Sequence, residues 1–389
     1  MKAVLKKGFG IGGRIARTLA ADPAPSFPFG TAEYWMEQAL LQSMESVGRA
    51  QPNPAVGCIL VQNQQFIGRG STRAWKQEHA ERVAFSGIDP GANLHEAVAY
   101  VTLEPCTHQG FQPPCVNLLL QSPIPKIVIA VPDPDPRVNG AGIRMLREAG
   151  KTVEVGILGP EARAWNLNFF MTRETGRPLW AAKWAQTLSG HLCDASGHSK
   201  WITGAESRAH VHWLRQKYDS IVVGARTFLL DQPQLTVRDC AEPHHRSPER
   251  FVFDPKGRTL DLPSERRVGF RILVCESELR ARAGGIESGI IPVPAPVDSP
   301  ELWGVFRQVL ESLEFPRPLQ SVLVEGGPGL LQELLKHDFF TVVHRFVGAR
   351  SFETVSEEHR MAWAPGEGWS FQTDEEIHGD RLHEWIKEV

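Results

Sequence analysis

A chain of 389 residues is too long for one ordinary hydrophobic core, so its length predicts two domains. Its composition, 42% hydrophobic and 22% charged, is typical of a globular protein, and its formal net charge of −3 gives no bulk attraction to nucleic acid. No apolar run approaches the roughly 20 residues that span a bilayer, and six cysteines in a chain of this size do not make a disulfide framework, which favours a reducing, cytoplasmic location.

The first 29 residues are predicted to form a flexible N-terminal tail. Five basic residues precede the first acidic one, and a proline-rich joint at 23–28 follows. Gly8, Gly10 and Gly13 spell G-x-G-x-x-G, but a dinucleotide-binding loop needs a preceding strand within a βαβ unit, which residues 1–7 do not clearly supply. We therefore interpret the segment as a tail, or as an organellar targeting peptide because its start is basic and free of acidic residues.

Residues 30–175 alternate helical and strand-like patterns and are predicted to form an α/β domain with a sheet sandwiched by helices. Thr31 is a suitable cap for a helix that continues to about Gly48. Nearly continuous apolar runs predict buried strands, the first two of which are expected to pair as a hairpin. The predicted strands are 55–61, 66–70, 100–103, 126–131 and 153–155, and predicted helices begin at His79, Cys115 and residue 140.

One histidine and two cysteines in this domain form a candidate zinc site. His79 begins a predicted helix, Cys106 follows a predicted strand, and Cys115 follows two prolines. Three protein ligands leave the fourth tetrahedral position open for water, which is how catalytic zinc sites are built. We therefore expect these three residues to hold one catalytic Zn²⁺ ion.

Glu81 lies two residues after the histidine and completes a pattern typical of zinc-dependent deaminases that act on nucleobase-like rings. It need not bind the metal, because its predicted role is to take a proton from the zinc-bound water and return protons to the leaving nitrogen as ammonia departs. Two other interpretations stay open: a structural zinc site with a fourth ligand such as His108, and buried thiols without metal.

Residues 176–389 begin a second α/β series after the hinge Gly176-Arg177-Pro178. The last predicted strand runs into a glycine-rich loop, 325–329, and then a helix, a geometry that presents backbone N–H groups to a phosphate. Residues after about Arg350 show no clear period, so no element is predicted there. The predicted strands are 179–184, 220–223, 250–253, 271–274 and 321–324.

The motifs of both domains, in this order, resemble those of the bifunctional deaminase/reductase family of riboflavin biosynthesis. The resemblance covers about residues 32–345, and the joint presence of both motif sets makes it specific. The first domain carries 52–58 (PNPAVGC), 79–81 (HAE), 102–108 (TLEPCTH) and 113–115 (PPC), and the second carries 200–203 (KWIT), 231–238 (DQPQLTVR) and 324–328 (VEGGP).

This resemblance implies a cytidine-deaminase-like α/β/α sandwich followed by a dihydrofolate-reductase-like α/β domain. The first would be a zinc-dependent deaminase that hydrolyses the 2-amino group from 2,5-diamino-6-ribosylamino-4(3H)-pyrimidinone 5′-phosphate. The second would use NADPH to reduce the ribosyl group to ribityl. The implied partners are this small pyrimidine ribotide and further copies of the chain in a homo-oligomer, with no nucleic acid and no membrane.

The family motifs also assign site residues by position. For the deaminase substrate they imply Asn53 and His108. For the reductase substrate they imply Ser199, Arg215, Leu235, Arg238 and Glu325. For NADPH they imply Trp201, Thr227, Asp231 and the 327–333 loop, which begins with Gly327, Pro328 and Gly329. The two arginines suit the substrate phosphate, and the loop suits the cofactor phosphates.

Several positions depart from the family pattern. Thr72 and the run 75–78 replace a histidine and an Ala-Gly-x-Pro run, and Phe111 stands where an arginine is expected. In the second domain Ser189 and His191 interrupt a usual Leu-Asp-Gly-Arg. These departures leave open a partly degenerate homologue, with one active domain or a related pyrimidine as substrate. A nucleic-acid base deaminase fits less well, because its two cysteines are normally separated by two residues rather than eight.

Overall fold

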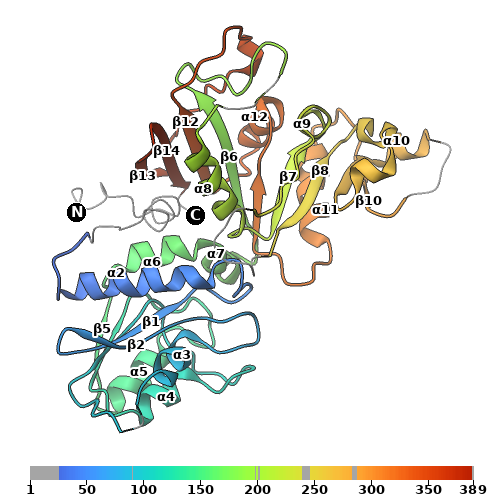
Figure 1. Ribbon diagram of the computed structural model, residues 1–389. Coiled ribbons are helices and arrows are strands. Elements are labelled where there is room, and N and C mark those ends of the chain that lie inside the picture. The colour runs from blue at the N-terminus through green and yellow to red at the C-terminus, as the bar shows by residue number, and fades with distance from the viewer. Residues whose placement is uncertain are drawn as a thin grey trace. The chain divides into compact units, whose positions relative to one another are not determined.

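The computed structural model describes residues 26–89, 91–197, 199, 202–238, 246–282 and 287–387. The chain divides between Arg177 and Pro178 into two compact units, each with its own sheet (Figure 1). Most of the predicted tail, residues 1–25, lies outside the described residues. No helix within the described ranges is long and apolar enough to cross a membrane.

The first unit is built on a five-stranded sheet with the order β2-β1-β3-β4-β5. β1 is antiparallel to both of its neighbours, β2 and β3, whereas β3, β4 and β5 run parallel to one another. All five strands predicted for this part of the chain are confirmed. Their bounds are β1 Gly57–Gln62, β2 Gln65–Ser71, β3 Val98–Val101, β4 Lys126–Ile129 and β5 Thr152–Val155.

Helices cover both faces of this sheet, which confirms the predicted sandwich. Along β1, Ile59 and Val61 pack in the cluster of α2 and α6, whereas Cys58 and Leu60 pack in the cluster of α3, α4 and α5, because successive strand side chains point to opposite faces (Figure 1). The helices are α2 Ala32–Gln42, α3 Ala80–Ser86, α4 Cys115–Gln121, α5 Ala141–Glu148, α6 Gly159–Trp165 and α7 Leu167–Thr175.

The first helix is shorter than predicted. Thr31 caps α2 by accepting a hydrogen bond from the Tyr34 amide, as expected, but the α-helix ends at Gln42 and continues as a 3₁₀ turn over Ser43–Ser46. The Ser43 hydroxyl donates to the Leu40 carbonyl at 2.6 Å, a local bond of the kind that competes with regular helix geometry. The α-helix itself is therefore shorter than predicted, although the 3₁₀ turn carries the helical segment to Ser46, close to the predicted end near Gly48.

The second unit is built on a nine-stranded sheet with the order β10-β9-β8-β7-β11-β6-β12-β14-β13. The strands from β10 to β12 are parallel, and β14 and β13 add an antiparallel edge. The five predicted strands are β6 Leu179–Thr187, β7 Ser220–Gly224, β8 Glu249–Phe253, β9 Arg271–Cys275 and β11 Ser321–Val324. The helices are α8 Ala205–Arg215, α9 Ala225–Asp231, α10 Glu276–Arg280, α11 Leu302–Ser312 and α12 Pro328–Lys336.

Four strands of this sheet were not predicted: β10 Ile290–Val293, β12 Val342–Gly348, β13 Trp369–Ile377 and β14 Asp380–Lys387. In β13 polar residues occupy most positions, so no apolar alternation marks it. Its partner β14 follows a two-residue turn in which His378 and Gly379 have φ of 47° and 89°. Positive φ at both positions is the type I′ geometry that suits a tight hairpin.

Candidate active sites

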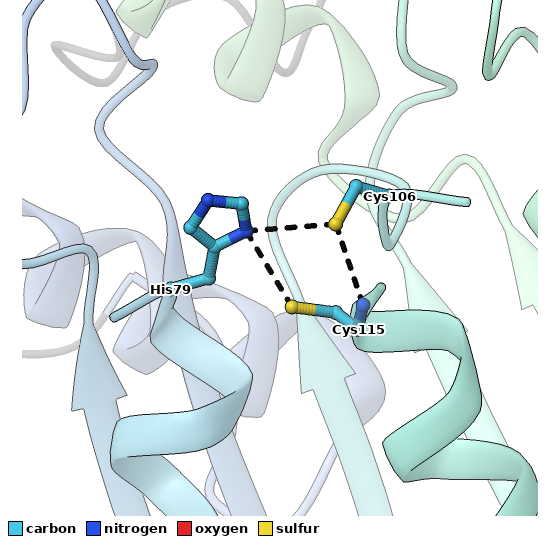
Figure 2. A group of neighbouring side chains, drawn as sticks. All are labelled: His79, Cys106 and Cys115. Carbon is cyan, nitrogen blue, oxygen red and sulfur yellow. Dashed lines mark hydrogen bonds between the residues drawn. The ribbon is translucent and has the colours of Figure 1, made fainter. Parts of the chain in front are cut away.

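The three predicted metal ligands converge from separate elements of the first unit. His79 is the N-cap of α3, Cys106 lies in the loop after β3, and Cys115 is the first residue of α4 (Figure 2). The helix-opening position of His79 sets its backbone in the extended region, φ −78° and ψ 162°, and so turns its ring away from the helix towards the cysteines. The predicted cluster is therefore assembled by the fold.

The distances between the donor atoms fit a tetrahedral zinc ion. His79 Nδ1 lies 3.6 Å from Cys106 Sγ and 3.5 Å from Cys115 Sγ. Zn–N and Zn–S bonds of ordinary length, set at the tetrahedral angle, place nitrogen and sulfur about 3.6 Å apart. All three donor atoms lie within 4.8 Å of one another, and Glu81 is not among them. The residues present thus fit Zn²⁺ with three protein ligands.

Hydrogen bonds within the cluster favour an anionic sulfur. The bond with the Cys115 side chain is the main cause that lowers the pKa of Cys106 to about 4, and the Cys115 amide also donates to Cys106 Sγ at 3.3 Å. The same side-chain bond and burial raise the pKa of Cys115. A thiolate is the form of cysteine that binds zinc, so Cys106 is held in the form that a metal ligand needs, whereas Cys115 would lose its proton on binding the metal.

Glu81 lies in the first turn of α3 and is 4% exposed. Burial, followed by the charge of Cys106, raises the pKa of its carboxyl group above the ordinary value. The carboxyl lines the same cavity as His79 and Cys106. Glu81 lies beside the proposed metal ligands but is not one of them, as expected of a proton shuttle.

A cavity of about 260 Å³ opens onto this cluster and contains both predicted substrate contacts, Asn53 and His108. The Nδ1 atom of His108 is buried and has no hydrogen-bond partner within the described ranges, which is unusual for a buried polar atom. Thr72 is buried in the wall, whereas the Phe111 side chain is 68% exposed. Lys76 and Gln77 line the cavity as well, so four of the positions that depart from the family pattern lie on this cavity.

Two further features of this cavity were missed in the sequence. Glu104 is buried and accepts backbone hydrogen bonds from Asp133, Gly140 and Ile143 at 3.1, 2.8 and 3.1 Å, which fixes the loop that carries Cys106. Asp133 lines the cavity, and burial raises the pKa of its carboxyl to about 6. Glu104 lies in the motif 102–108 and Asp133 in the loop 133–136, but neither segment shows locally which partners these carboxyl groups meet.

The second unit contains a cavity of about 740 Å³ at the carboxyl ends of β7 and β11, a usual location for ligands in open α/β sheets. It brings together the described reductase-site residues predicted from the motifs, except that only residues 327–330 of the predicted 327–333 loop line it. From Pro328 onward this segment is the helix α12 rather than a loop. Trp201 falls outside the described residues. The residues gathered here are Ser199, Arg215, Thr227, Asp231, Leu235, Arg238, Glu325, Gly327, Pro328 and Gly329.

A buried ion-pair network forms one wall of this cavity. Glu325 accepts two hydrogen bonds from Arg215, at 2.7 and 3.0 Å, and one from Lys183 at 3.4 Å. Burial opposes ionisation of Glu325, but the two cations outweigh it and lower its pKa to about 2. Arg215 also donates to the Thr236 carbonyl at 3.2 Å. Its guanidinium, predicted as a phosphate donor, is thus already engaged within the chain.

Lys183 was not predicted as a site residue. It projects from β6 into the cavity, and burial, partly offset by Glu325, lowers the pKa of its ammonium group. The sequence signal was a single lysine within the apolar run 179–184. A charged residue in a buried strand needs a partner or a function, and here it has Glu325 as a partner and faces the cavity.

The predicted cofactor loop is anchored on the same cavity. The Gly327 amide donates to the Thr227 hydroxyl at 3.1 Å, and Pro328 and Gly329 begin α12. The Ser199 hydroxyl donates to Asp231 at 3.1 Å. A helix N-terminus and a glycine loop at the edge of a large cavity fit the phosphates of a nucleotide cofactor.

Glu358 and His359, beyond the last predicted element, also line this cavity. His359 Nδ1 lies 2.8 Å from the Asp194 carbonyl, so it carries the proton, and Arg226 donates to His359 Nε2 at 3.2 Å. These residues were missed because the segment after residue 350 has no regular period, so nothing local places them at a site.

Comparisons with known proteins give matches in both units. A family model described as the cytidine and deoxycytidylate deaminase zinc-binding region matches residues 30–131, and one described as the RibD C-terminal domain matches residues 178–350. The riboflavin biosynthesis protein RibD of Aquifex aeolicus is 35% identical over 321 residues, 81% of this chain and 86% of that protein. The protein of the same name from Bacillus amyloliquefaciens is 39% identical over 324 residues, 80% and 83% of the two chains.

A solved structure from Thermotoga maritima resembles the chain over most of its length. It is described as a diaminohydroxyphosphoribosylaminopyrimidine deaminase/5-amino-6-(5-phosphoribosylamino)uracil reductase. The TM-score is 0.74 with 31% sequence identity, covering 92% of this chain and 98% of the other. A RibD structure from Acinetobacter baumannii gives a TM-score of 0.69 with 28% identity, covering 92% and 99%.

Proposed function

This chain belongs to the RibD family of riboflavin-biosynthesis proteins, and from this premise we propose how its residues carry out two reactions. It is a bifunctional enzyme with a zinc-dependent deaminase and an NADPH-dependent reductase. The observation that carries the assignment is the set of His79, Cys106 and Cys115 at tetrahedral zinc distances beside the buried Glu81. We assign deamination to residues 30–175 and reduction to residues 176–389.

In the deaminase, His79, Cys106 and Cys115 would hold the metal. Zn²⁺ in a site of this kind is a Lewis acid that lowers the pKa of a water molecule to about 7. Glu81 takes a proton from the attacking water and returns it to the amino nitrogen, which leaves as ammonia. Asn53 and His108 orient the pyrimidine ring, and Glu104 holds the loop of Cys106 in place.

In the reductase, the loop at Gly327, Thr227 and Asp231 would hold the cofactor, with Trp201 assigned by the motif alone. When bound, NADPH supplies a hydride. Ser199, Leu235 and Arg238 bind the ribotide. Glu325 holds Arg215 and Lys183 in fixed positions on the cavity wall, and the Lys183 ammonium donates a proton to the sugar oxygen that becomes a hydroxyl.

The remaining assignments rest on the family. We propose that the enzyme works in the cytoplasm on a small pyrimidine ribotide and forms a homo-oligomer, which light scattering of the purified protein would test.

Removal of the metal is expected to separate the two activities. After treatment with a chelator, ammonia release from the diamino ribotide should cease, whereas NADPH oxidation with the deaminated ribotide should continue, because the ligands of the proposed zinc site all lie in the first unit. Zinc content and both rates are measured on the same sample, and added Zn²⁺ should restore ammonia release. A zinc-loaded protein that releases no ammonia, or consumes no NADPH, would instead indicate a homologue with one active domain.

Arg238→Ala is expected to weaken binding of the phosphorylated substrate to the reductase. Loss of a charged hydrogen bond should raise KM on the order of tenfold or more, while Arg238→Lys, which keeps the positive charge, should be less affected. Steady-state NADPH oxidation measures both variants. An unchanged KM for Arg238→Ala would refute the assignment of this residue to the substrate phosphate.

A further inference from the structure

Three side chains at the mouth of the deaminase cavity form a cation–aromatic cluster. The Lys76 ammonium lies 4.3 Å from the centre of the Trp75 ring and 5.0 Å from the centre of the Phe111 ring. The two rings meet edge to face, 6.5 Å apart at 80°. Lys76 and Phe111 both line the cavity, and these three positions all belong to the stretches where the chain departs from its family pattern.

The loop that carries Lys76 is closed by its own backbone. The Arg73 amide donates to the Glu78 carbonyl at 2.9 Å, and the Gln77 amide donates to the Ala74 carbonyl at 2.9 Å. Lys76 itself has φ of 71°, in the left-handed region that a residue with a side chain seldom adopts. The backbone turn and the two rings together hold the ammonium group at one place on the cavity rim.

The two arginines that line this cavity share one carboxylate as their partner. Arg137 donates two hydrogen bonds to Asp135, at 2.9 and 2.6 Å, and Arg173 lies 3.8 Å from the same carboxylate. The contacts of Lys76 within the described ranges are with aromatic rings, and no carboxylate pairs with its ammonium group. Within the described part of the chain, Lys76 is therefore the one lysine or arginine lining the cavity that has no carboxylate partner.

Resting on the deaminase function proposed above, we propose that Lys76 binds the 5′-phosphate of the ribotide. The amino-bearing carbon must reach the metal ligands and Glu81 inside the cavity, so the ribosyl phosphate extends towards the rim. Phe111 stands where the family motif has an arginine, and its ring holds the Lys76 ammonium that supplies the missing positive charge from the opposite loop. The segment 72–78 thus supplies a cation to the site that would bind the phosphate.

Lys76→Met is expected to raise the deaminase KM for the ribotide on the order of tenfold, with kcat little changed, because a charge-assisted contact to a non-reacting group is lost. KM for the dephosphorylated riboside should not change. Introducing Phe111→Arg into the Lys76→Met protein should restore a low KM for the ribotide, since it returns a cation to the same rim. Ammonia release measures all of these rates.

Lys126→Met is the matched control, because Lys126 is a partly exposed lysine of the same unit that pairs with Glu154 and does not line the cavity. It should leave both KM values unchanged. If the wild type releases ammonia, two results would overturn the phosphate assignment alone. One is an equal change in KM for ribotide and riboside in Lys76→Met, and the other is no change in either KM. A wild-type protein without ammonia release would overturn the deaminase function and this inference with it.

Discussion

Glu81→Gln is expected to abolish ammonia release while the protein still binds one zinc ion per chain. The amide is nearly the same size as the carboxyl group but cannot take a proton from water or return one to the leaving nitrogen. Loss of a general acid–base typically costs about 10²- to 10⁴-fold in rate. Zinc should remain bound because the proposed metal ligands are His79, Cys106 and Cys115, and Glu81 is not one of them.

The measurements for this variant are metal content, ammonia release and NADPH oxidation with the deaminated ribotide. Glu37→Gln is a suitable control, because Glu37 is also a buried glutamate of the first unit but lies on α2 and does not line the cavity. Substantial turnover by a zinc-loaded Glu81→Gln protein would show that another group carries the proton. Loss of zinc would instead place Glu81 among the residues that hold the metal.

Glu325→Gln is expected to destabilise the second unit and stop NADPH oxidation. The carboxylate pairs with Arg215 and Lys183, whose side chains are 12% and 15% exposed, and removal of one partner from a buried network typically costs about 3–5 kcal/mol. Amide hydrogen exchange in β6 and β11 would report the local loss. Ammonia release by the first unit should continue. Glu276→Gln, which removes the partner of Arg280 at the surface of α10, should have little effect.

The effect of this substitution should depend on pH in a defined direction. The pKa of Glu325 in the folded protein is lowered to about 2, whereas an unperturbed glutamate titrates near 4.3. The carboxylate therefore stabilises the fold above the unfolded-state pKa, and this contribution is lost as the pH falls towards 2. The difference in stability between wild type and Glu325→Gln should be largest above about pH 5 and shrink on acidification. A difference that grows on acidification would contradict the network.

Local features of the sequence were sufficient for much of the fold. Apolar runs such as 55–61 and 321–324 predict buried strands because a parallel or central strand is covered on both faces. Thr31 predicts a helix start because its hydroxyl satisfies a free amide of the first turn. The zinc ligands were also predictable, since His79, Cys106 and Cys115 lie in short motifs whose residue types have few other uses together.

Other features depend on contacts between distant segments and were not predictable. The strands β13 and β14 carry few apolar residues, so they are recognisable only once β12 offers them an edge. Glu104 acquires its role from backbone amides 29 to 39 residues away. In each case the contacting segment is too far away in the sequence for a local pattern of side chains to reveal it.

The sequence by itself determined the two α/β domains, the zinc ligands, Glu81 and the set of motifs that gather on the reductase cavity. Only the tertiary structure decided how the charged side chains pair. Glu325 meets Arg215 and Lys183 across 110 and 142 residues, and Lys76 reaches the ring of Phe111 from a separate loop. The physical reason is that backbone propensity and side-chain period are local, whereas the pairing of a buried charge depends on which elements the fold places side by side.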